Sequence, residues 1–580
     1  MSSSRARRRL LRAVLGGALL GFPAAAAIAR IVPPHAADSP APNTATVPMH
    51  ADSRATITLT PITGITQGRG FLPVRIRIEN RFRETQRWRV DFSYLSYERG
   101  QTTCNSAFAI EAAAGTASET VVFVPLAFDG ANRSGFGYTQ LSATVSGPDA
   151  TGFPTGILGG GAIGNRHIAA SRSLEARIQD MLREQEKTLP RSGPRGPPAQ
   201  QADYLWEPTM VDIAAWPADW RVWSVFSAVV LEESEWEQLD NARRAALLDW
   251  AATGGQLLLF PRGPRSEDRE RWSAGAVWRL AQPLAATGRA ELARLLDEAD
   301  AAAVNVRRWP GASTLNDPKD PLTQPFRAGG WLIGFVICFA ILAGPVNLYW
   351  FAPAGKRHRL FLTVPALSLG GTLALWIAIL IGDGIGGHGA RQAVVTLLPG
   401  ENRAMVFQQQ LVRTGAIASG DFRLRPDTAM AVLTEPGVRT LQTSFAREGE
   451  QASGDWFTNR SILRHELLRI EPTRARVELV GGGKGAPPVV QSSLGTTLRD
   501  FEYVDDMGRR WLAAEVPPGR RVTLAPPNRE LTFSYAEPAR RGQFRALGGA
   551  SDLAPIPTHG SIRWEDRSIL YTGRLEAAQP

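Results

Sequence analysis

The sequence predicts a multidomain α+β membrane protein: an N-terminal β-sandwich, an α/β domain, a two-helix transmembrane hairpin and a C-terminal β-sandwich region. Three observations predict this fold class. Two long uncharged apolar runs stand in the middle of the chain, and a strand–helix–strand pattern precedes them. Before that pattern, apolar and polar residues alternate with a period of two, which is typical of half-buried β-strands.

The composition is that of a folded protein with several domains. Its 580 residues exceed the roughly 100–200 residues of one domain, while 44% hydrophobic and 21% charged residues are ordinary globular values. The net charge of +10 comes from arginines spread along the chain, without a basic stripe interleaved with aromatic residues. This pattern excludes a nucleic-acid-binding role and favours a surface close to anionic lipid.

Residues 1–29 have the three parts of a signal sequence. An arginine-rich start precedes the apolar stretch Ala13 to Phe22, and the small residues from Ala24 to Ala29 suit a signal peptidase. Because a stable span needs about 20 apolar residues, we expect cleavage, with an uncleaved N-terminal anchor as the alternative. Residues 30–53, rich in Pro, Ala, Ser and Thr, are expected to form a flexible leader.

Residues 330–351 and 360–381 carry no charged side chain, and each is long enough to cross a hydrocarbon core of ~30 Å. The basic loop 352–359 between them belongs in the cytoplasm by the positive-inside rule. Both soluble regions then lie outside the cytoplasm, as the signal sequence independently predicts. We therefore expect a bacterial inner-membrane protein whose soluble regions are extracytoplasmic, and periplasmic if the envelope is Gram-negative. Spans without acidic or basic side chains argue against a transport path.

The soluble region before the hairpin contains two predicted domains. Residues 54–150 show the period-two alternation, as in Val74, Ile76 and Ile78, and are expected to form an antiparallel sandwich. Residues 151–312 contain the strand Ser227 to Leu231, a helix with Asp240 as its N-cap, and the strand Gln256 to Phe260. Nearly continuous apolar strands joined by a helix predict a parallel sheet.

The run from Leu239 to Phe260, with Gly-Pro-Val-Asn at 344–347 and Pro365 after a basic turn, resembles uncharacterised bacterial envelope proteins. In that family a class I glutamine-amidotransferase-like domain accompanies a transmembrane hairpin. The resemblance covers roughly residues 154–385 and implies a flavodoxin-like α/β domain. True amidotransferases use a cysteine nucleophile with a histidine base, whereas residues 151–312 contain no cysteine. The amidotransferase activity is therefore not expected here.

No motif predicts a catalytic residue, a cofactor or a metal. Gly159, Gly161 and Gly164 have the G-x-G-x-x-G spacing but lack a clear preceding strand, so we expect a glycine-rich loop. His465 and Glu466 lack the spacing of a zinc hydrolase. Residues 390–580 contain many short strand-like segments separated by turns, and we expect a β-rich extracytoplasmic region there.

Six side chains of the α/β domain are candidates for a ligand or partner surface. Glu232 and Glu233 follow one predicted strand, and Arg262 and Arg265 follow the next. Ligands of open parallel sheets bind at the carboxyl ends of strands, where these opposite charges could meet. Trp220 and Trp223 belong to a dense tryptophan cluster that could hold a sugar or a peptide, although packing in a core is the commoner role.

The leading interpretation is a membrane-anchored, non-catalytic envelope scaffold. Its expected partners are the lipid bilayer and envelope or membrane proteins, with no nucleic acid. An extracytoplasmic sensor that binds a ligand such as a carbohydrate or peptidoglycan fragment is one alternative, and an enzyme with an unrecognised site is another. An aromatic-floored pocket would favour the sensor, whereas convergent titratable groups in a deep cleft would favour the enzyme.

Overall fold

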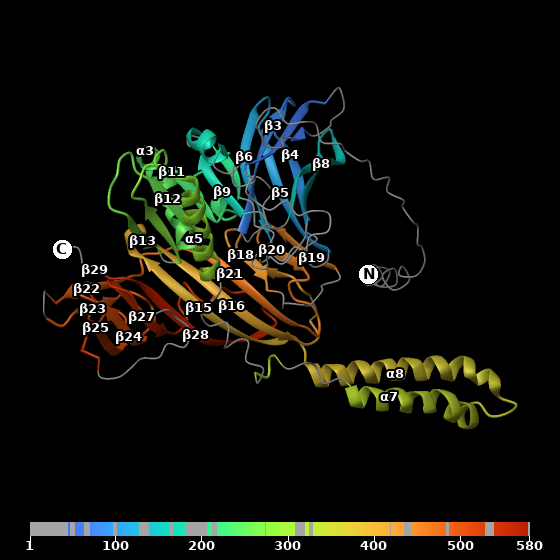
Figure 1. Ribbon diagram of the computed structural model, residues 1–580. Coiled ribbons are helices and arrows are strands. Elements are labelled where there is room, and N and C mark those ends of the chain that lie inside the picture. The colour runs from blue at the N-terminus through green and yellow to red at the C-terminus, as the bar shows by residue number, and fades with distance from the viewer. Residues whose placement is uncertain are drawn as a thin grey trace, which may run out of the picture. The chain divides into compact units, whose positions relative to one another are not determined.

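Figure 1 shows the computed structural model of the chain. The chain divides into two units, residues 1–41 and 42–580. The structure describes residues 45–46, 53–62, 70–96, 101–126, 138–162, 166–180, 206–211, 217–272, 274–307, 320–323, 329–417, 419–433, 442–482, 486–527 and 539–577. The predicted signal sequence and most of the predicted leader lie outside the described residues.

Two sheets form the N-terminal β-region. The first has the order β1-β2-β3-β6, made of Ala45–Thr46, Ala55–Pro61, Gly70–Asn80 and Ala117–Leu126. The second contains β4 (Gln86–Ser96), β5 (Gln101–Ala112), β7 (Tyr138–Gly147) and β8 (Ala150–Ala162). The period-two prediction is confirmed, because Val74, Ile76 and Ile78 are fully buried while Arg77 between them is exposed.

Strand β8 corrects two details of the sequence analysis. It pairs with β7, and Gly159 lies opposite Leu141 in that ladder. The expected glycine-rich loop is therefore partly a strand, and residues 151–162, which we expected in the α/β domain, belong to the N-terminal sheet. Glycine is rare in strand interiors, which is why its spacing here suggested a loop.

Five parallel strands and one antiparallel edge strand form the parallel sheet, in the order β10-β9-β11-β12-β14-β13. Their bounds are Arg166–Ser171 (β9), Trp206–Val211 (β10), Ala228–Glu232 (β11), Gln256–Phe260 (β12), Asp268–Trp272 (β13) and Gly275–Arg279 (β14). The accompanying helices are η1 (Arg172–Leu174), η3 (Trp220–Trp223), α3 (Glu233–Gln238), α4 (Asn241–Ala252) and α5 (Arg289–Arg307).

Both faces of the parallel sheet are covered. Val229 and Leu231 of β11 join one hydrophobic cluster with residues of α4, whereas Val230 joins a second cluster with residues of α5. This arrangement explains the nearly continuous apolar strands in the sequence. The predicted cap of α4 is confirmed, since the Asp240 carboxylate accepts a hydrogen bond from Arg243 N at 2.8 Å.

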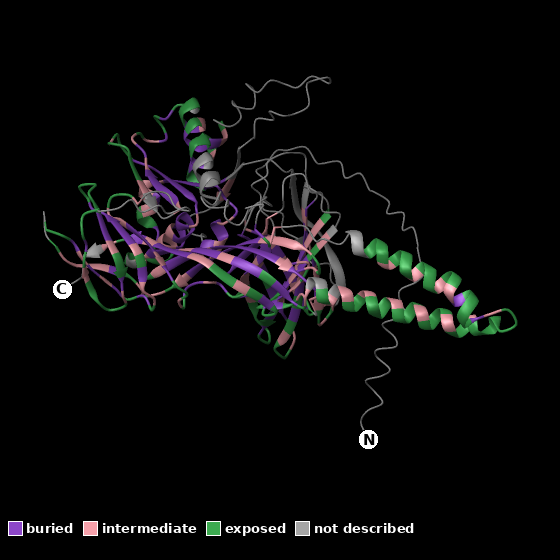
Figure 2. Cartoon of the chain, turned by 90° about the horizontal axis from the view of Figure 1, so that it is seen from below, coloured by how far each residue is buried: buried purple, intermediate pink, exposed green. Residues whose placement is uncertain are grey.

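Two helices are long and apolar enough to cross a membrane, over Leu332–Phe351 and Arg357–Ala378. The first consists of α7 (Gly329–Ile341) and a π-helical segment, η4 (Leu342–Phe351); after the short η5 (Arg357–Arg359), α8 (Leu360–Asp383) follows. Figure 2 shows that most of their described residues are exposed, as expected of lipid-facing helices. The helices approach closely at Gly371, where an added Cβ would lie 2.6 Å from the Phe339 ring.

An eight-stranded sheet dominates the region after the hairpin, with the order β18-β21-β16-β15-β28-β27-β24-β25. Its strands are β15 (Gly387–Leu398), β16 (Arg403–Thr414), β18 (Ala429–Val432), β21 (Ile462–Pro472), β24 (Leu498–Val504), β25 (Arg510–Val516), β27 (Gln543–Gly548) and β28 (Ile562–Arg574). A smaller sheet contains β22 (Val477–Gly481), β23 (Val489–Ser492), β26 (Arg521–Thr523) and β29 (Glu576–Ala577).

Three strands after the hairpin join the sheet before it. The second N-terminal sheet has the order β17-β20-β19-β5-β4-β7-β8, in which β17 is Phe422–Arg423, β19 is Gln442–Glu448 and β20 is Gln451–Gly454. Strand β19 pairs in parallel with β5, from Gln442 opposite Gln101 to Glu448 opposite Ala107. The expected separation between residues 54–150 and 390–580 is therefore incomplete, because they share a sheet.

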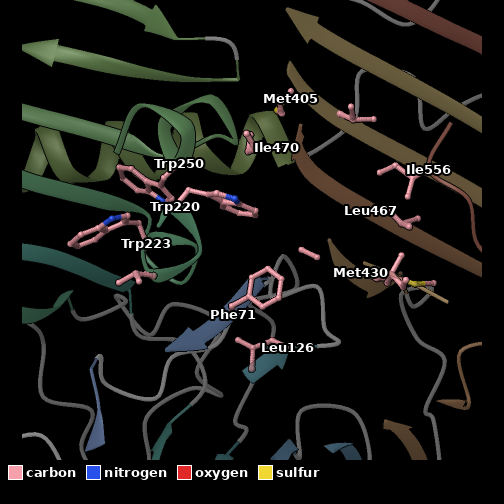
Figure 3. Packing of buried hydrophobic residues seen from close by; sticks show 14 of the residues in the cluster. Phe71, Leu126, Trp220, Trp223, Trp250, Met405, Met430, Leu467, Ile470 and Ile556 are labelled. Atoms are coloured by element: carbon pink, nitrogen blue, oxygen red, sulfur yellow. The ribbon is translucent and has the colours of Figure 1, made fainter. Parts of the chain in front are cut away.

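Further contacts connect the regions before and after the hairpin. Ion pairs join Arg89 to Glu448, Arg403 to the buried Asp249, Arg567 to Asp320, and Arg574 to Glu270. One hydrophobic cluster contains residues of the N-terminal sheets, the parallel sheet and the eight-stranded sheet; Figure 3 shows part of it. These contacts build the flanking regions into one body.

Candidate functional site

The carboxyl ends of β9, β11, β12 and β14 lie along one edge of the parallel sheet, because these strands run in the same direction. Strands β9 and β11 are neighbours, but β10 comes between them in the chain and lies on the other side of β9. The chain therefore reverses its direction of winding at β9 and β11. Open parallel sheets bind ligands at such a point.

Two of the candidate charges meet at this edge. Arg265 Nη1 lies 2.6 Å from Glu233 Oε1, and both side chains are about a quarter exposed (26% and 29%). The same guanidinium donates from Nε to Leu280 O at 3.2 Å. Glu232 is half-buried at the start of α3, and Arg262 is exposed on the loop after β12. The structure thus brings together Glu233 and Arg265, and no contact joins Glu232 to Arg262 among the described residues.

A buried cluster of oxygens lies at the reversal point. Glu235 Oε1 accepts hydrogen bonds from Ser171 Oγ at 2.5 Å and from Ser173 Oγ, and the two hydroxyls are 2.6 Å apart. Glu235 Oε2 also accepts from Glu232 N at 2.9 Å. Ser171 is the last residue of β9 and Glu235 belongs to α3, so the cluster connects the strand to the helix. The sequence contains no signal for it, because 64 residues separate the partners.

This cluster does not have the arrangement of a hydrolytic site. A serine nucleophile needs a histidine or lysine base within hydrogen-bond reach, with an oriented third group. The hydroxyls of Ser171 and Ser173 both donate their single proton to Glu235, and no histidine contact to them is found in the described part of the chain. The carboxylate is already satisfied by three donors, which is typical of a structural role.

Trp220 and Trp223 lie in the hydrophobic core. Their exposed fractions are 8% and 1%, and Trp220 packs edge-on against Phe71 of β3 with ring centroids 6.0 Å apart. Figure 3 shows both indoles among apolar side chains from the other sheets. In this position they join the α/β domain to the N-terminal β-region and present no open aromatic face.

His465 shows most clearly how the buried polar groups of the C-terminal region are used. Its Nε2 donates to Trp456 O at 2.8 Å, and its Nδ1 accepts from Gln410 Nε2 at 3.3 Å. Burial lowers the pKa of His465 to about 4. A neutral imidazole with both nitrogens occupied stabilises the fold and is not available as a general base.

This histidine predicts a pH dependence of stability. In the unfolded chain His465 takes up a proton near pH 6.5, whereas in the folded chain it does so only near pH 4. Protonation therefore favours the unfolded state. The free energy of unfolding has its full value above about pH 6.5 and falls as the pH is lowered from 6.5 to 4. The loss amounts to about 3 kcal/mol. Thermal unfolding of the full-length protein in detergent should show a smaller pH slope for His465→Gln. The exposed His388 supplies the control, His388→Gln; an unchanged slope in His465→Gln would contradict the prediction.

Metal ligands do not gather in the described part of the chain, where no group of three or more His, Cys, Asp or Glu side chains could hold an ion. The two cysteines are far apart in the fold: Cys104 is buried in β5 and Cys338 is exposed on α7. Burial raises the pKa of the Cys104 thiol to about 12, so this thiol is not a nucleophile at neutral pH.

Comparison with known proteins adds no family. No family model matches the chain, and no curated protein matches it. Among solved structures, Northeast Structural Genomics Consortium target SoR45 has 11% identity and a TM-score of 0.11, over 21% of this chain and 80% of that chain. Bacteroides uniformis beta-glucuronidase 2 (11%, TM-score 0.14) aligns over 38% and 35%, and Parabacteroides merdae beta-glucuronidase (9%, TM-score 0.13) over 87% and 77%. Scores this low support no statement about fold or function.

Proposed function

We propose that the chain is a non-catalytic scaffold, anchored in a bacterial inner membrane by the hairpin α7–α8. Its β-sandwich, α/β and C-terminal β-rich domains lie together on the extracytoplasmic side. They present a composite surface to envelope or membrane proteins. No nucleic acid and no cofactor take part.

The pairing of β5 with β19 supports the membrane topology of this proposal. These strands flank the hairpin in the chain and hydrogen-bond along seven residue pairs in one sheet. A sheet cannot continue through a bilayer, so the chain between them must cross the membrane an even number of times. Two apolar helices meet this requirement, and the basic loop at Lys356–Arg359 favours the cytoplasm for the turn.

The strand order supports a flavodoxin-like α/β domain. When the parallel strands are numbered along the chain, their order in the sheet is 2-1-3-4-5, which is that of doubly wound flavodoxin-like folds. The resemblance to exported amidotransferase-like domains agrees with this order. The absence of cysteine from residues 151–312 and the satisfied Ser171–Glu235 cluster favour a binding or structural role for the domain.

The proposed topology predicts which positions a membrane-impermeant maleimide can reach in spheroplasts. In a Cys338→Ala background, Ala514→Cys on β25 should be labelled in intact spheroplasts. Ala354→Cys in the loop after η4 should be labelled only after lysis, because the bilayer shields it. Both alanines are exposed, so accessibility within the protein is matched. Labelling of Ala354→Cys in intact spheroplasts would contradict the topology.

The scaffold role is tested by quantitative co-purification of the full-length tagged protein from native membranes in mild detergent. A stoichiometric envelope or membrane partner is expected. A folded protein that reproducibly purifies alone, from membranes that retain other known complexes, would count against a scaffold.

A second candidate function is an extracytoplasmic sensor for an anionic ligand. One nitrogen atom without a hydrogen-bond partner favours it. Arg265 Nη2 is buried and has no hydrogen-bond partner among the described residues. An anionic group of a ligand could accept a hydrogen bond from Arg265 Nη2, beside Glu233 at the carboxyl edge of the sheet. Calorimetry of the full-length protein with acidic wall fragments would test this candidate, and Arg265→Gln should abolish any binding that is found.

A further inference from the structure

The connection from α8 to the eight-stranded sheet is short and held by hydrogen bonds. Only Gly384, Ile385 and Gly386 separate the end of α8 from β15. Gly386 N donates to Ala416 O at 2.8 Å, Ala416 N to Gly384 O at 3.0 Å, and Gly415 N to Gly386 O at 2.7 Å. Even fully extended, the four Cα–Cα steps from Asp383 to Gly387 span at most about 14 Å. The first residues of β15 therefore lie close to the headgroup layer if α8 spans the membrane.

The segment before α7 is attached to the same end of the same sheet. Asp320 forms an ion pair with Arg567 of β28, and Pro321 O accepts a hydrogen bond from Arg413 Nη1 at 3.1 Å. Leu322 packs against Ala390 and Leu411 of β15 and β16. Both chain segments that enter and leave the hairpin thus hold this sheet end toward the membrane.

A row of basic side chains crosses this sheet end. His388 of β15 lies opposite Arg413 of β16 and opposite Arg563 of β28. Directly opposite residues point to the same face, so the two arginines flank His388 on one face of the sheet. His388 and Arg563 are exposed, and no ion pair of Arg563 exists in the described part of the chain. The nearby Glu565 lies 3.7 Å from Arg567, which also pairs with Asp320.

An exposed apolar residue accompanies the row. Ile385, in the connection itself, is 82% exposed, although the glycine that follows it is buried. An isoleucine at this height can enter the boundary between headgroups and acyl chains. The sheet end thus combines an apolar contact with cationic groups, which are the two terms of peripheral membrane binding.

We propose that the row Arg413–His388–Arg563, with Ile385, is a binding surface for the phosphates of anionic phospholipids in the outer leaflet. The inference rests on the proposed membrane placement of the hairpin. Guanidinium groups bind phosphate through several hydrogen bonds, and a bound phosphate neutralises the positive charge of the two arginines. Lipid contact then fixes the orientation of the extracytoplasmic body above the bilayer.

Hydrogen exchange of the full-length protein in lipid nanodiscs tests the surface. Amides of residues 384–388 and 561–565 should exchange roughly fivefold more slowly in discs with phosphatidylglycerol than in discs of phosphatidylcholine alone. Arg563→Glu should remove this difference. Arg521→Glu, the same charge change at an exposed arginine of β26, should leave it intact.

Equal exchange in the two lipids, or an equal loss in Arg521→Glu, would overturn the inference. The same data report on α7 and α8, whose amides must be protected if the hairpin is inserted. Protected helices without a lipid effect at the sheet end would refute only the lipid surface. Freely exchanging helices would refute the membrane anchoring as well.

Discussion

Replacing Trp223 by alanine is expected to lower the free energy of unfolding by about 3–5 kcal/mol. The indole is 1% exposed, packs against Phe226 at a centroid distance of 6.3 Å, and belongs to the cluster that joins three sheets. Its removal leaves a cavity that the surrounding strands cannot close, because each is held in its own sheet.

Denaturant unfolding of the full-length protein, followed by intrinsic fluorescence, measures this effect. Trp236→Ala is the matched control, since Trp236 is only partly buried at the edge of the same cluster, and a smaller loss is expected. A Trp223→Ala protein of unchanged stability that no longer bound a glycan would instead establish the tryptophans as a ligand platform.

Two halves of the chain, separated between Gly355 and Lys356 in the loop after η4, are expected to assemble when co-expressed. The β5–β19 ladder, the shared core and the ion pair between Arg403 and buried Asp249 all join the halves. Contacts of this extent resemble the interior of one domain and favour stable association without a covalent connection.

Co-purification through a tag on one half measures the assembly, and Ala446→Pro should disrupt it. Ala446 lies in β19 between β20 and β5, so proline would both remove a ladder donor and clash with a neighbouring strand. Ala446→Val keeps the amide and should preserve assembly. If the two halves do not co-purify even without a substitution at Ala446, the one-body architecture is contradicted.

The sequence by itself determined the elements whose signal is local. The alternation of Val74, Ile76 and Ile78 specifies a half-buried strand, and Asp240 before an apolar-periodic segment specifies a helix start. The two apolar helices also follow from composition alone, because crossing a membrane depends on length and charge along one segment.

The tertiary structure decided everything that depends on distant partners. Glu233 could be placed near Arg265 in advance, because parallel strands end at one edge, but the Ser171–Glu235 cluster could not. The role of Trp223 was also undecided, because the sequence does not distinguish a tryptophan that packs in a core from one that binds a ligand at the surface. The sequence of β19 does not indicate that this strand pairs with β5, because the neighbours of a strand in a sheet depend on how the whole sheets pack.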